Sequence, residues 1–249
     1  MVTVSCAEGE SGYVYEGELK FKLNSMNVGE LKRPKTKIMM NVASPDRAFA
    51  FSATPNDGVG LARLEFIINN SIGIHPNAVL GVEKIIDARV KREIRRRAEA
   101  YDSPVEFYVK KLAEGVSTIA AAFYPKKVIF RMSDFKSNEY ANLLGGKPFE
   151  PVEENPMIGF RGASRYYSDA FRDAFALECQ AMRMVREEKG LKNVCLMIPF
   201  TRTPGEGEKV LDLMAEHGLK RGEDGLEVYV MCEIPANVIA ADAFLDIFD

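Results

Sequence analysis

Residues 194–218 of the 249-residue chain read VCLMIPFTRTPGEGEKVLDLMAEHG, and this stretch decides the fold class. Its first seven residues form a nearly continuous apolar run, which is typical of a parallel strand buried on both faces. The residues from Glu206 to His217 are amphipathic and precede Gly218, a residue type that commonly ends helices. A buried strand followed by a helix is one β/α unit, so the stretch predicts an α/β fold.

The same alternation of apolar runs and amphipathic stretches continues from Lys37 to Asp249. Five further segments are candidate strands, one of them mixed between strand and helix character: 38–42, 58–68 (the mixed one), 128–131, 157–161 and 226–233. A closed barrel of this type needs eight β/α units. We therefore expect an incomplete (β/α)8 TIM-type barrel with about six strand units.

Helical patterns lie between these runs. We expect one helix from Ser168, as its N-cap, to about Lys189, and another that starts at Pro235. Residues 83–122 form a longer helical insertion, which we expect to be broken near residues 103–104, where a serine precedes a proline.

The first 35 residues have a different pattern. Residues 6–12 are rich in turn formers, and residues 13–23 alternate apolar and polar side chains like a half-buried strand. Residues 24–37 are polar and contain Pro34, as a linker would. We therefore expect two parts, a short N-terminal segment over residues 1–35 and the barrel domain over residues 36–249.

Composition excludes several classes of partner. The chain has 33 Lys+Arg and 36 Asp+Glu, a net charge of −3, which gives no reason to expect nucleic acid or an anionic membrane. No apolar run approaches the ~20 residues that cross a bilayer, and the residues after Met1 do not have the positive-then-apolar pattern expected of a signal peptide. Four scattered cysteines predict reduced, mostly buried thiols, and with them a cytoplasmic protein: Cys6, Cys179, Cys195 and Cys232.

Charged residues stand at the carboxyl ends of four apolar runs: Arg63, Arg131, Arg161 and Glu233. In a parallel barrel, functional groups gather at these strand ends. Arginine binds carboxylate or phosphate through paired hydrogen bonds, and Mg²⁺ usually takes one or two protein carboxylates together with substrate oxygens and water. The pattern predicts a site for an anionic substrate with Mg²⁺. The alternative is that the arginines only pair with acids nearby, such as Glu65 or Asp134.

Five stretches closely resemble the C-terminal PEP/pyruvate-binding barrel of the phosphoenolpyruvate synthases (pyruvate, water dikinases): GVGLARLEFII (58–68), PKKVIFRMSDFKSNEYANLLGG (125–146), ENPMIGFRGASRYYSDAFRDAFALE (154–178), MIPFTRT (197–203) and MCEIPANV (231–238). The segment CAEGESGYVYEG (6–17) is similar to the exit from that family's swivelling phosphohistidine domain. Residues 1–35 are therefore expected to be the end of that domain and its linker. Pyruvate, phosphate dikinase and Enzyme I of the sugar phosphotransferase system share parts of the pattern and remain alternatives.

The resemblance implies an enzyme that converts ATP, pyruvate and water to phosphoenolpyruvate, AMP and phosphate through a phosphohistidine. It implies that Arg63 and Arg131 bind carboxylate or phosphoryl oxygens of pyruvate or phosphoenolpyruvate. Glu233 would contact the substrate and ligate Mg²⁺, and Arg161 would be a second-line phosphoryl contact. ATP would bind through a module preceding Met1, and the intact enzyme would be a homodimer.

The family's phosphorylated histidine, its proton-donating cysteine and a second Mg²⁺ carboxylate are expected outside this chain. None of the histidines or cysteines present occupies those motifs. We therefore expect a piece of the enzyme, truncated at both ends, that has no catalytic residue of its own and is inactive alone. The competing hypothesis is a non-catalytic module derived from a barrel that binds a partner protein.

Overall fold

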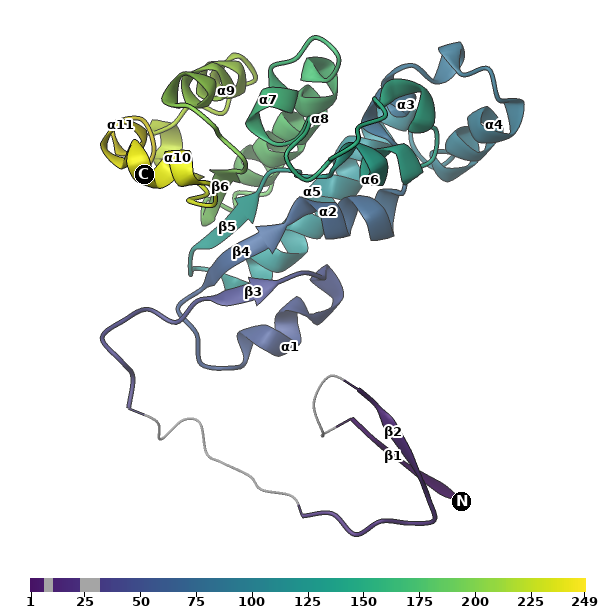
Figure 1. Cartoon of the computed structure of the whole chain (residues 1–249), viewed down its shortest axis with the longest axis vertical. Helices are drawn as coiled ribbons and strands as arrows, with labels where there is room; N and C mark the ends of the chain where they lie inside the picture. Colours follow the sequence, from purple (N-terminus) through teal and green to yellow (C-terminus); the bar gives the residue numbers. More distant parts are fainter. Residues whose placement is uncertain (7–10, 23–31) are drawn as a thin grey trace. The chain divides into compact units, whose positions relative to one another are not determined.

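The structure is a computed structural model that describes residues 1–6, 11–22 and 32–249. The chain forms two compact units, Met1–Lys35 and Thr36–Asp249. In the first unit, β1 (Val2–Ser5) pairs with β2 (Tyr13–Glu16) in an antiparallel hairpin (Figure 1). The strand predicted over residues 13–23 is thus confirmed for its first four residues. Residues 23–31, with most of the predicted linker, lie outside the described residues.

A parallel sheet is the centre of the second unit, which the structure describes throughout. Its strands are neighbours in chain order: β3 (Met40–Val42), β4 (Val59–Arg63), β5 (Val128–Arg131), β6 (Val194–Ile198) and β7 (Val228–Val230). This order is that of a barrel built from successive β/α units, and the sheet is not closed because β3 and β7 are its two edges (Figure 1). The predicted α/β class and incomplete barrel are confirmed, with five strands in Thr36–Asp249 instead of six.

The prediction of a strand at residues 157–161 is wrong. This segment belongs to an irregular connection, in which the side chains of Met157 and Ile158 are exposed. Its backbone groups bond to side chains instead of a neighbouring strand: Glu153 Oε1 accepts from the Phe160 amide at 2.8 Å, and Arg161 Nη1 donates to the Met157 carbonyl at 3.0 Å. Such side-chain bonds compete with sheet formation, which an apolar pattern alone does not reveal.

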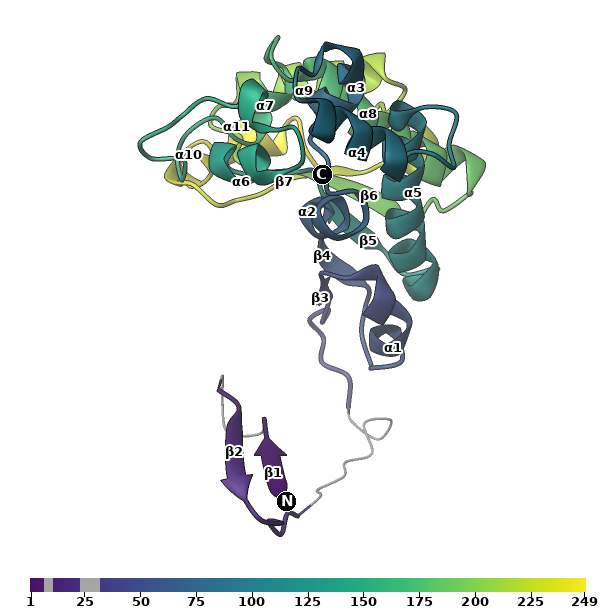
Figure 2. The ribbon, with the colours of Figure 1, turned by 90° about the vertical axis from the view of Figure 1, so that its right-hand side faces the viewer.

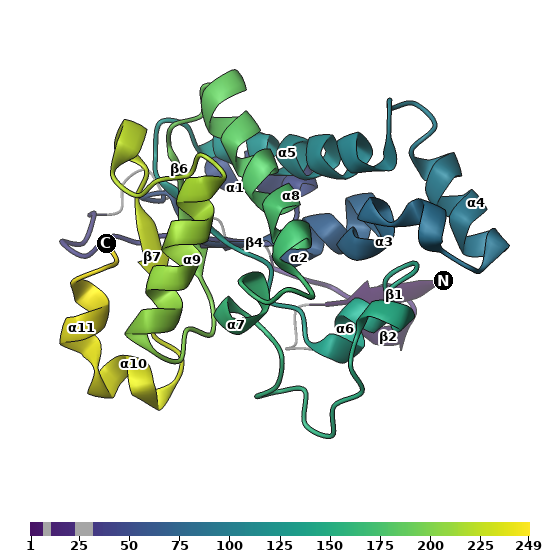
Figure 3. The same ribbon diagram turned by 90° about the horizontal axis from the view of Figure 1, so that it is seen from above.

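Helices occupy the connections between the strands. Figure 2 shows α1 and α5 on the same side of β4 and β5, and Figure 3 shows α5, α8 and α9 following one another across the sheet. The α-helices of this unit are α1 (Ala48–Ser52), α2 (Leu64–Ile67), α3 (Pro76–Leu80), α4 (Ala88–Arg97), α5 (Pro104–Phe123), α6 (Ser137–Asn142), α7 (Ala163–Tyr166), α8 (Arg172–Arg183), α9 (Pro204–Glu216), α10 (Pro235–Ile239) and α11 (Ala241–Leu245). Short 3₁₀ or π turns extend or join some of them: η2 (Pro45–Arg47), η3 (Ile68–Ile72), η4 (Val82–Lys84), η5 (Lys147–Phe149), η6 (Met184–Glu188) and η7 (Glu223–Gly225).

The start predicted for α8 is wrong by three residues, since the N-cap is Phe171 and not Ser168. Ser168 does not cap this helix, because its hydroxyl accepts from the Ala170 amide and its carbonyl accepts from the Phe171 and Arg172 amides. These bonds close a turn before the helix, and α8 begins at Arg172. The helix from Pro235 and the interrupted insertion over residues 83–122 are confirmed, the latter as α4 and α5.

The N-cap of α5 provides a test of local stability. Ser103 Oγ accepts from the Glu106 amide at 3.1 Å, and Pro104 occupies the first turn. We expect Ser103→Ala to lower the free energy of unfolding by about 1 kcal/mol, as measured by urea denaturation, because that amide loses its acceptor. Ser117→Ala in the same helix is the matched control: the buried Ser117 hydroxyl has no partner among the described residues, so its removal should cost nothing. Equal destabilisation by both changes would contradict the capping role.

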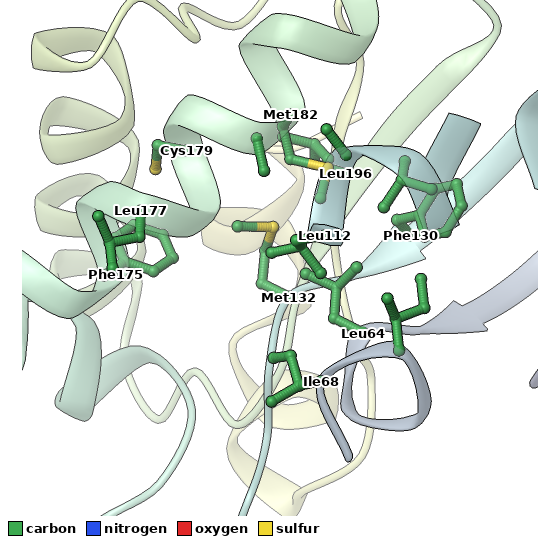
Figure 4. Packing of buried hydrophobic residues seen from close by; sticks show 14 of the residues in the cluster. Leu64, Ile68, Leu112, Phe130, Met132, Phe175, Leu177, Cys179, Met182 and Leu196 are labelled. Carbon is green, nitrogen blue, oxygen red and sulfur yellow. The ribbon is translucent and has the colours of Figure 1, made fainter. Parts of the chain in front are cut away.

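One apolar core connects the sheet with its helices. Figure 4 labels ten of its residues, which come from α2, η3, α5, β5, α8, β6 and the residue after β5. Cys179 and Cys195 are buried in this unit, whereas Cys6 and Cys232 are exposed, so the prediction of mostly buried thiols is correct for only half of them. Among the described residues, no helix is both long and apolar enough to cross a bilayer.

Candidate functional site

A cavity of about 300 Å³ lies at the carboxyl ends of β4 and β5. Three of the four predicted site residues line it, namely Arg63, Arg131 and Arg161. The parallel register places Arg63 directly beside Arg131, so two cations from neighbouring strands end at the same edge of the sheet. The charged lining residues are four cations and three acids, a net charge of +1: Arg63, Arg131, Lys136 and Arg161 against Glu65, Asp134 and Glu139.

Arg131 is held by two carboxylates. Its Nη2 donates to Glu65 Oε1 at 2.5 Å, and its Nη1 lies 3.6 Å from Asp134 Oδ2. Burial opposes the charge of Arg131, but the two carboxylates outweigh it and raise the pKa of the guanidinium. Within the described residues its buried Nε has no hydrogen-bond partner. The guanidinium is therefore fixed in place while it keeps donor capacity.

Glu65 joins two parts of the site. Besides Arg131, its Oε1 accepts from the Asp134 backbone amide at 2.8 Å, so one oxygen ties the residue that ends β5 to the turn beyond it. Burial raises the pKa of Glu65, and the positive charge of Arg131 opposes that rise only in part. Its other oxygen is buried without a partner among the described residues. This carboxylate depends on Arg131 for compensation of its charge.

Arg161 comes from the loop that was predicted as a strand. Its Nε and Nη2 donate to the two oxygens of Asp134 at 2.9 and 2.7 Å, and these hydrogen bonds raise the pKa of the guanidinium. Its Nη1 donates to the Met157 carbonyl, so each of its three nitrogens already has an acceptor. The next residue, Gly162, has φ +60° and lies so close to β6 that a Cβ would come within 2.5 Å of the Pro199 carbonyl oxygen. That close approach needs a glycine and brings Arg161 to the cavity.

Arg63 differs from the other two arginines. Its side chain is exposed, and among the described residues it makes no hydrogen bond or ion pair. The alternative that the arginines pair with nearby acids thus describes Arg131 and Arg161 but not Arg63. All the donors of Arg63 are available to an anion that enters the cavity.

Glu233 does not line this cavity. It follows β7, and its Oε1 accepts from the Phe200 backbone amide, beyond β6, at 2.7 Å. Its negative charge nevertheless contributes to the raised pKa of Arg161, which places it within electrostatic range of the arginines. Among the described residues, no three His, Cys, Asp or Glu side chains are grouped so that they could hold a metal ion.

Two further residues, just beyond the end of β6, contact Arg161 or its loop and were not predicted. The Phe200 ring, at a residue with φ +52°, faces Arg161 at 4.5 Å and Arg202 at 5.1 Å from its centroid. Arg202 Nη2 donates to the Gly159 carbonyl at 2.8 Å and so fastens the loop that carries Arg161. The strand-end rule that selected Arg131 could also have selected Arg202, which follows the predicted strand at 194–200 by two residues.

A larger cavity of about 850 Å³ lies away from these residues, between the start of α4 and the segment from α6 to η5. Apolar side chains such as Ile85, Val90 and Phe149 line much of it. It brings together none of the predicted site residues, so its size does not make it the better candidate.

Comparisons with known proteins relate this chain to one family of enzymes. Residues 20–249 match the family described as PEP-utilising enzyme, PEP-binding domain. The whole chain is 59% identical over 248 residues to the phosphoenolpyruvate synthase of Pseudomonas aeruginosa and 57% identical to that of Escherichia coli K12, covering 31% of each. It is 40% identical over 258 residues to a probable phosphoenolpyruvate synthase of Staphylothermus marinus, with 97% of this chain and 28% of that protein covered. The chain thus spans about a third of the length of these relatives.

Proposed function

Since the chain belongs to the family of PEP-utilising enzymes and contains their PEP-binding domain, we propose that its strand-end cavity binds phosphoenolpyruvate and pyruvate. The observation that carries this proposal is the convergence of Arg63, Arg131 and Arg161 on one cavity. Phosphoenolpyruvate has a carboxylate and a phosphoryl group, and guanidinium groups bind both through paired hydrogen bonds.

The three arginines have different roles, which depend on how many of their N–H donors are free to bind the ligand. Arg63, without a partner among the described residues, and Arg131, with an unpaired Nε, bind the carboxylate or phosphoryl oxygens directly. The nitrogens of Arg161 already donate to Asp134 and Met157, so Arg161 stabilises the phosphoryl group through its positive charge and not as a primary hydrogen-bond donor. Pyruvate reacts as its enolate, so positive charge fixed beside the developing oxyanion and the moving phosphoryl oxygens lowers the barrier.

Glu233 is the residue of this chain that would hold Mg²⁺. Its Oε1 is oriented by the Phe200 amide, and its Oε2 has no hydrogen-bond partner among the described residues. One carboxylate suits Mg²⁺, which fills its other positions with water and substrate oxygens. When bound, the ion supplies Lewis-acid polarisation of a substrate oxygen.

The chain covers about a third of the length of its relatives, so the activity of the whole protein is a separate proposal. We propose that the intact protein converts ATP, pyruvate and water to phosphoenolpyruvate, AMP and phosphate, as its similarity to phosphoenolpyruvate synthases over the whole chain supports. In this proposal residues 1–35 are the end of the phosphohistidine domain, ATP binds at a module preceding Met1, and the enzyme is a cytoplasmic homodimer. A monomeric intact protein in equilibrium sedimentation would contradict the last point.

The test is an assay of the intact protein with ATP and pyruvate, in which phosphoenolpyruvate, orthophosphate and pyrophosphate are measured. We expect phosphoenolpyruvate to form with orthophosphate and without added phosphate. Formation of pyrophosphate that requires added phosphate would instead identify a pyruvate, phosphate dikinase. Absence of phosphoenolpyruvate, together with capture of a partner protein by the folded chain, would favour the non-catalytic module.

Glu233→Gln tests the metal assignment. We expect Mg²⁺ to raise the affinity of this chain for phosphoenolpyruvate about tenfold in isothermal titration calorimetry, and Glu233→Gln to remove that gain, because the amide lacks the ligand charge. Glu216→Gln is the control, since Glu216 is exposed and the one ion pair it makes among the described residues is with Arg172, at 3.6 Å. An unchanged Mg²⁺ effect in Glu233→Gln would exclude this residue as the ligand.

A further inference from the structure

A buried acid lies behind the turn that carries the site residues. Glu178 on α8 is completely buried, and its Oε2 accepts from the Ser133 backbone amide at 3.1 Å. Its Oε1 accepts from the Ser133 hydroxyl. Among the described residues, no lysine, arginine or histidine pairs with this carboxylate. A carboxylate without a counter-ion is an expensive group to bury, so a role other than stability needs to be considered.

Ser133 is held on every side by buried groups. Besides its two bonds to Glu178, its hydroxyl bonds to the Tyr140 hydroxyl at 2.7 Å, and its carbonyl accepts from the Tyr166 hydroxyl at 2.6 Å. All the polar groups of Ser133 are thus engaged by side chains from α6, α7 and α8. This residue cannot move without breaking several buried hydrogen bonds.

The position of Ser133 in the chain gives these contacts a consequence for the site. It lies between Arg131, which ends β5, and Asp134, which holds Arg161 with both carboxylate oxygens. The Met132 amide donates to the Met197 carbonyl at 3.0 Å, so the chain stays in the sheet up to the residue before Ser133. A displacement of Ser133 therefore changes the position of Asp134. It also changes the position of the Arg161 side chain, which Asp134 orients.

Other titratable groups surround Glu178, and within the part of the chain that the structure describes none of them is a cation. Glu65 on α2 adds negative charge, while Tyr108 on α5, Tyr140 on α6 and Tyr166 on α7 are buried hydroxyls whose pKa the Glu178 charge helps to raise. The neighbouring thiol of Cys179 is affected in the same way. Burial raises the pKa of Glu178 to about 7, although the hydrogen bonds from Ser133 oppose the rise. The carboxyl group therefore changes charge near neutral pH.

We propose that Glu178 is a positioning residue for the anion site, and that its carboxylate form, acting through Ser133, holds Asp134 and Arg161 where they support the bound phosphoryl group. This rests on the proposed function for the ligand, but not for the coupling between Glu178 and the turn. In the structure both oxygens of Glu178 act as acceptors, which is the pattern of the ionised form. Protonation at Oε1 turns this oxygen from an acceptor into a donor, so the bond from the Ser133 hydroxyl must reverse or break.

The deciding experiment follows the backbone amides of Ser133 and Asp134 by ¹⁵N NMR between pH 5.5 and 8.5. We expect both signals to titrate with a midpoint of about 7 in the wild-type chain. Neither should show a titration with this midpoint in Glu178→Gln, which keeps the size of the side chain and cannot ionise. If the Asp134 signal does not respond to this titration, Glu178 does not act on the site and the proposal is overturned.

A second measurement separates positioning from ordinary stabilisation. Between pH 4.5 and about 7 the folded chain keeps a proton that the unfolded chain has released, so ionising Glu178 costs stability as the pH rises. Glu178→Gln should therefore unfold at no lower urea concentration than the wild type at pH 8. It should nevertheless bind phosphoenolpyruvate about tenfold more weakly at pH 8, since small misplacements of binding groups are costly. The two proteins should bind equally at pH 5.5.

Tyr108→Phe is the matched control for the affinity measurement. The Tyr108 hydroxyl is buried near Glu178 and has no hydrogen-bond partner among the described residues, so its loss should leave the affinity unchanged. If Glu178→Gln lost stability and affinity together at every pH, Glu178 would have only a structural role and the proposal would be overturned. If phosphoenolpyruvate binds neither protein while the amide titration occurs only in the wild type, the proposed ligand is wrong and the positioning role stands.

Discussion

Replacing Arg131 by alanine is expected to weaken phosphoenolpyruvate binding by this chain at least about 100-fold, since truncating one partner of a buried charge pair costs several kcal/mol. Two losses combine in this variant. The ligand loses the N–H donors of a fixed guanidinium, and the charge of the lining residues falls from +1 to 0. Glu65, whose Oε1 lies 2.5 Å from Arg131 Nη2, is then left as a buried carboxylate without a cation. Isothermal titration calorimetry in the presence of Mg²⁺ measures the change.

Two variants distinguish this effect from damage to the fold. Arg131→Lys keeps the charge but loses the fork, so we expect an intermediate affinity. Arg131→Ala combined with Glu65→Gln removes the uncompensated carboxylate, and we expect it to recover stability in urea denaturation without recovering binding. Arg95→Ala, at an exposed residue that pairs with Glu83, should change neither quantity. In the intact protein, undiminished turnover after Arg131→Ala would refute the site assignment.

The strand ends could be predicted from the sequence because burial on both faces leaves a clear pattern. The predicted strand at 128–131 forms β5 with those bounds, and its first three residues are buried. Charge at the end of such a run is equally visible, which is why Arg63 and Arg131 could be selected before the structure was known. The parallel register then places these two residues side by side. Local pattern and strand order together sufficed for this half of the site.

The apolar pattern failed where side chains, and not a neighbouring strand, satisfy the backbone. Residues 157–161 have the composition of a strand, but Glu153 and Arg161 bond to the backbone of this segment. The number of strand units was therefore too high by one. Arg161 still reaches the site because its loop is attached to the end of β6, where the Ala163 amide donates to the Pro199 carbonyl at 3.1 Å.

The partners of the arginines could not be predicted, because they depend on distances between segments far apart in the sequence. Glu65 and Arg131 are 66 residues apart and meet only because β4 and β5 are neighbours. Glu178 reaches Ser133 across 45 residues from the far side of the turn. An acid on an amphipathic helix is normally solvated, so the sequence gives no sign that this one is buried.

Arg165→Met is expected to lower the free energy of unfolding by about 3–5 kcal/mol, the usual cost of removing one partner of a buried ion pair. The Arg165 side chain is 1% exposed, and its Nη1 and Nη2 donate to the two oxygens of Glu150 at 2.6 and 2.7 Å. Nη2 also donates to Ser137 Oγ at 3.1 Å and to the Phe160 carbonyl at 2.8 Å. This network attaches the loop that carries Arg161 to α6 and α7, so its loss should also lower the affinity for phosphoenolpyruvate. Urea denaturation of the two chains measures the stability change.

The pH dependence of this loss identifies its cause. Burial opposes the charge of Glu150, but hydrogen bonds from His75, at 3.0 Å, and from Arg165 keep its pKa below 4.5 in the wild type. That depressed pKa stabilises the fold above pH 4.5, and the contribution is lost as the pH falls through the lower value. Without Arg165, burial should prevail and raise the pKa of Glu150, so the variant regains stability relative to the wild type as the pH falls from 8 to 5.5. Burial lowers the pKa of His75. If His75 gains a proton in this pH range, the resulting imidazolium pairs with Glu150 and also makes the variant more stable relative to the wild type.

Two comparisons complete this test. Arg172→Met removes an exposed arginine that lies 3.6 Å from Glu216, and it should cost less than about 1 kcal/mol at any pH. Arg165→Met combined with Glu150→Leu replaces both charges by apolar groups, and we expect it to be more stable than Arg165→Met alone. The Arg165 guanidinium also lies over the rings of Tyr140, Phe160 and Phe171, 4.3–5.0 Å from their centroids. If the double variant were no more stable than Arg165→Met, and the destabilisation by Arg165→Met did not change with pH, the lost stability would come from this packing. The uncompensated carboxylate would then not be the cause of the loss.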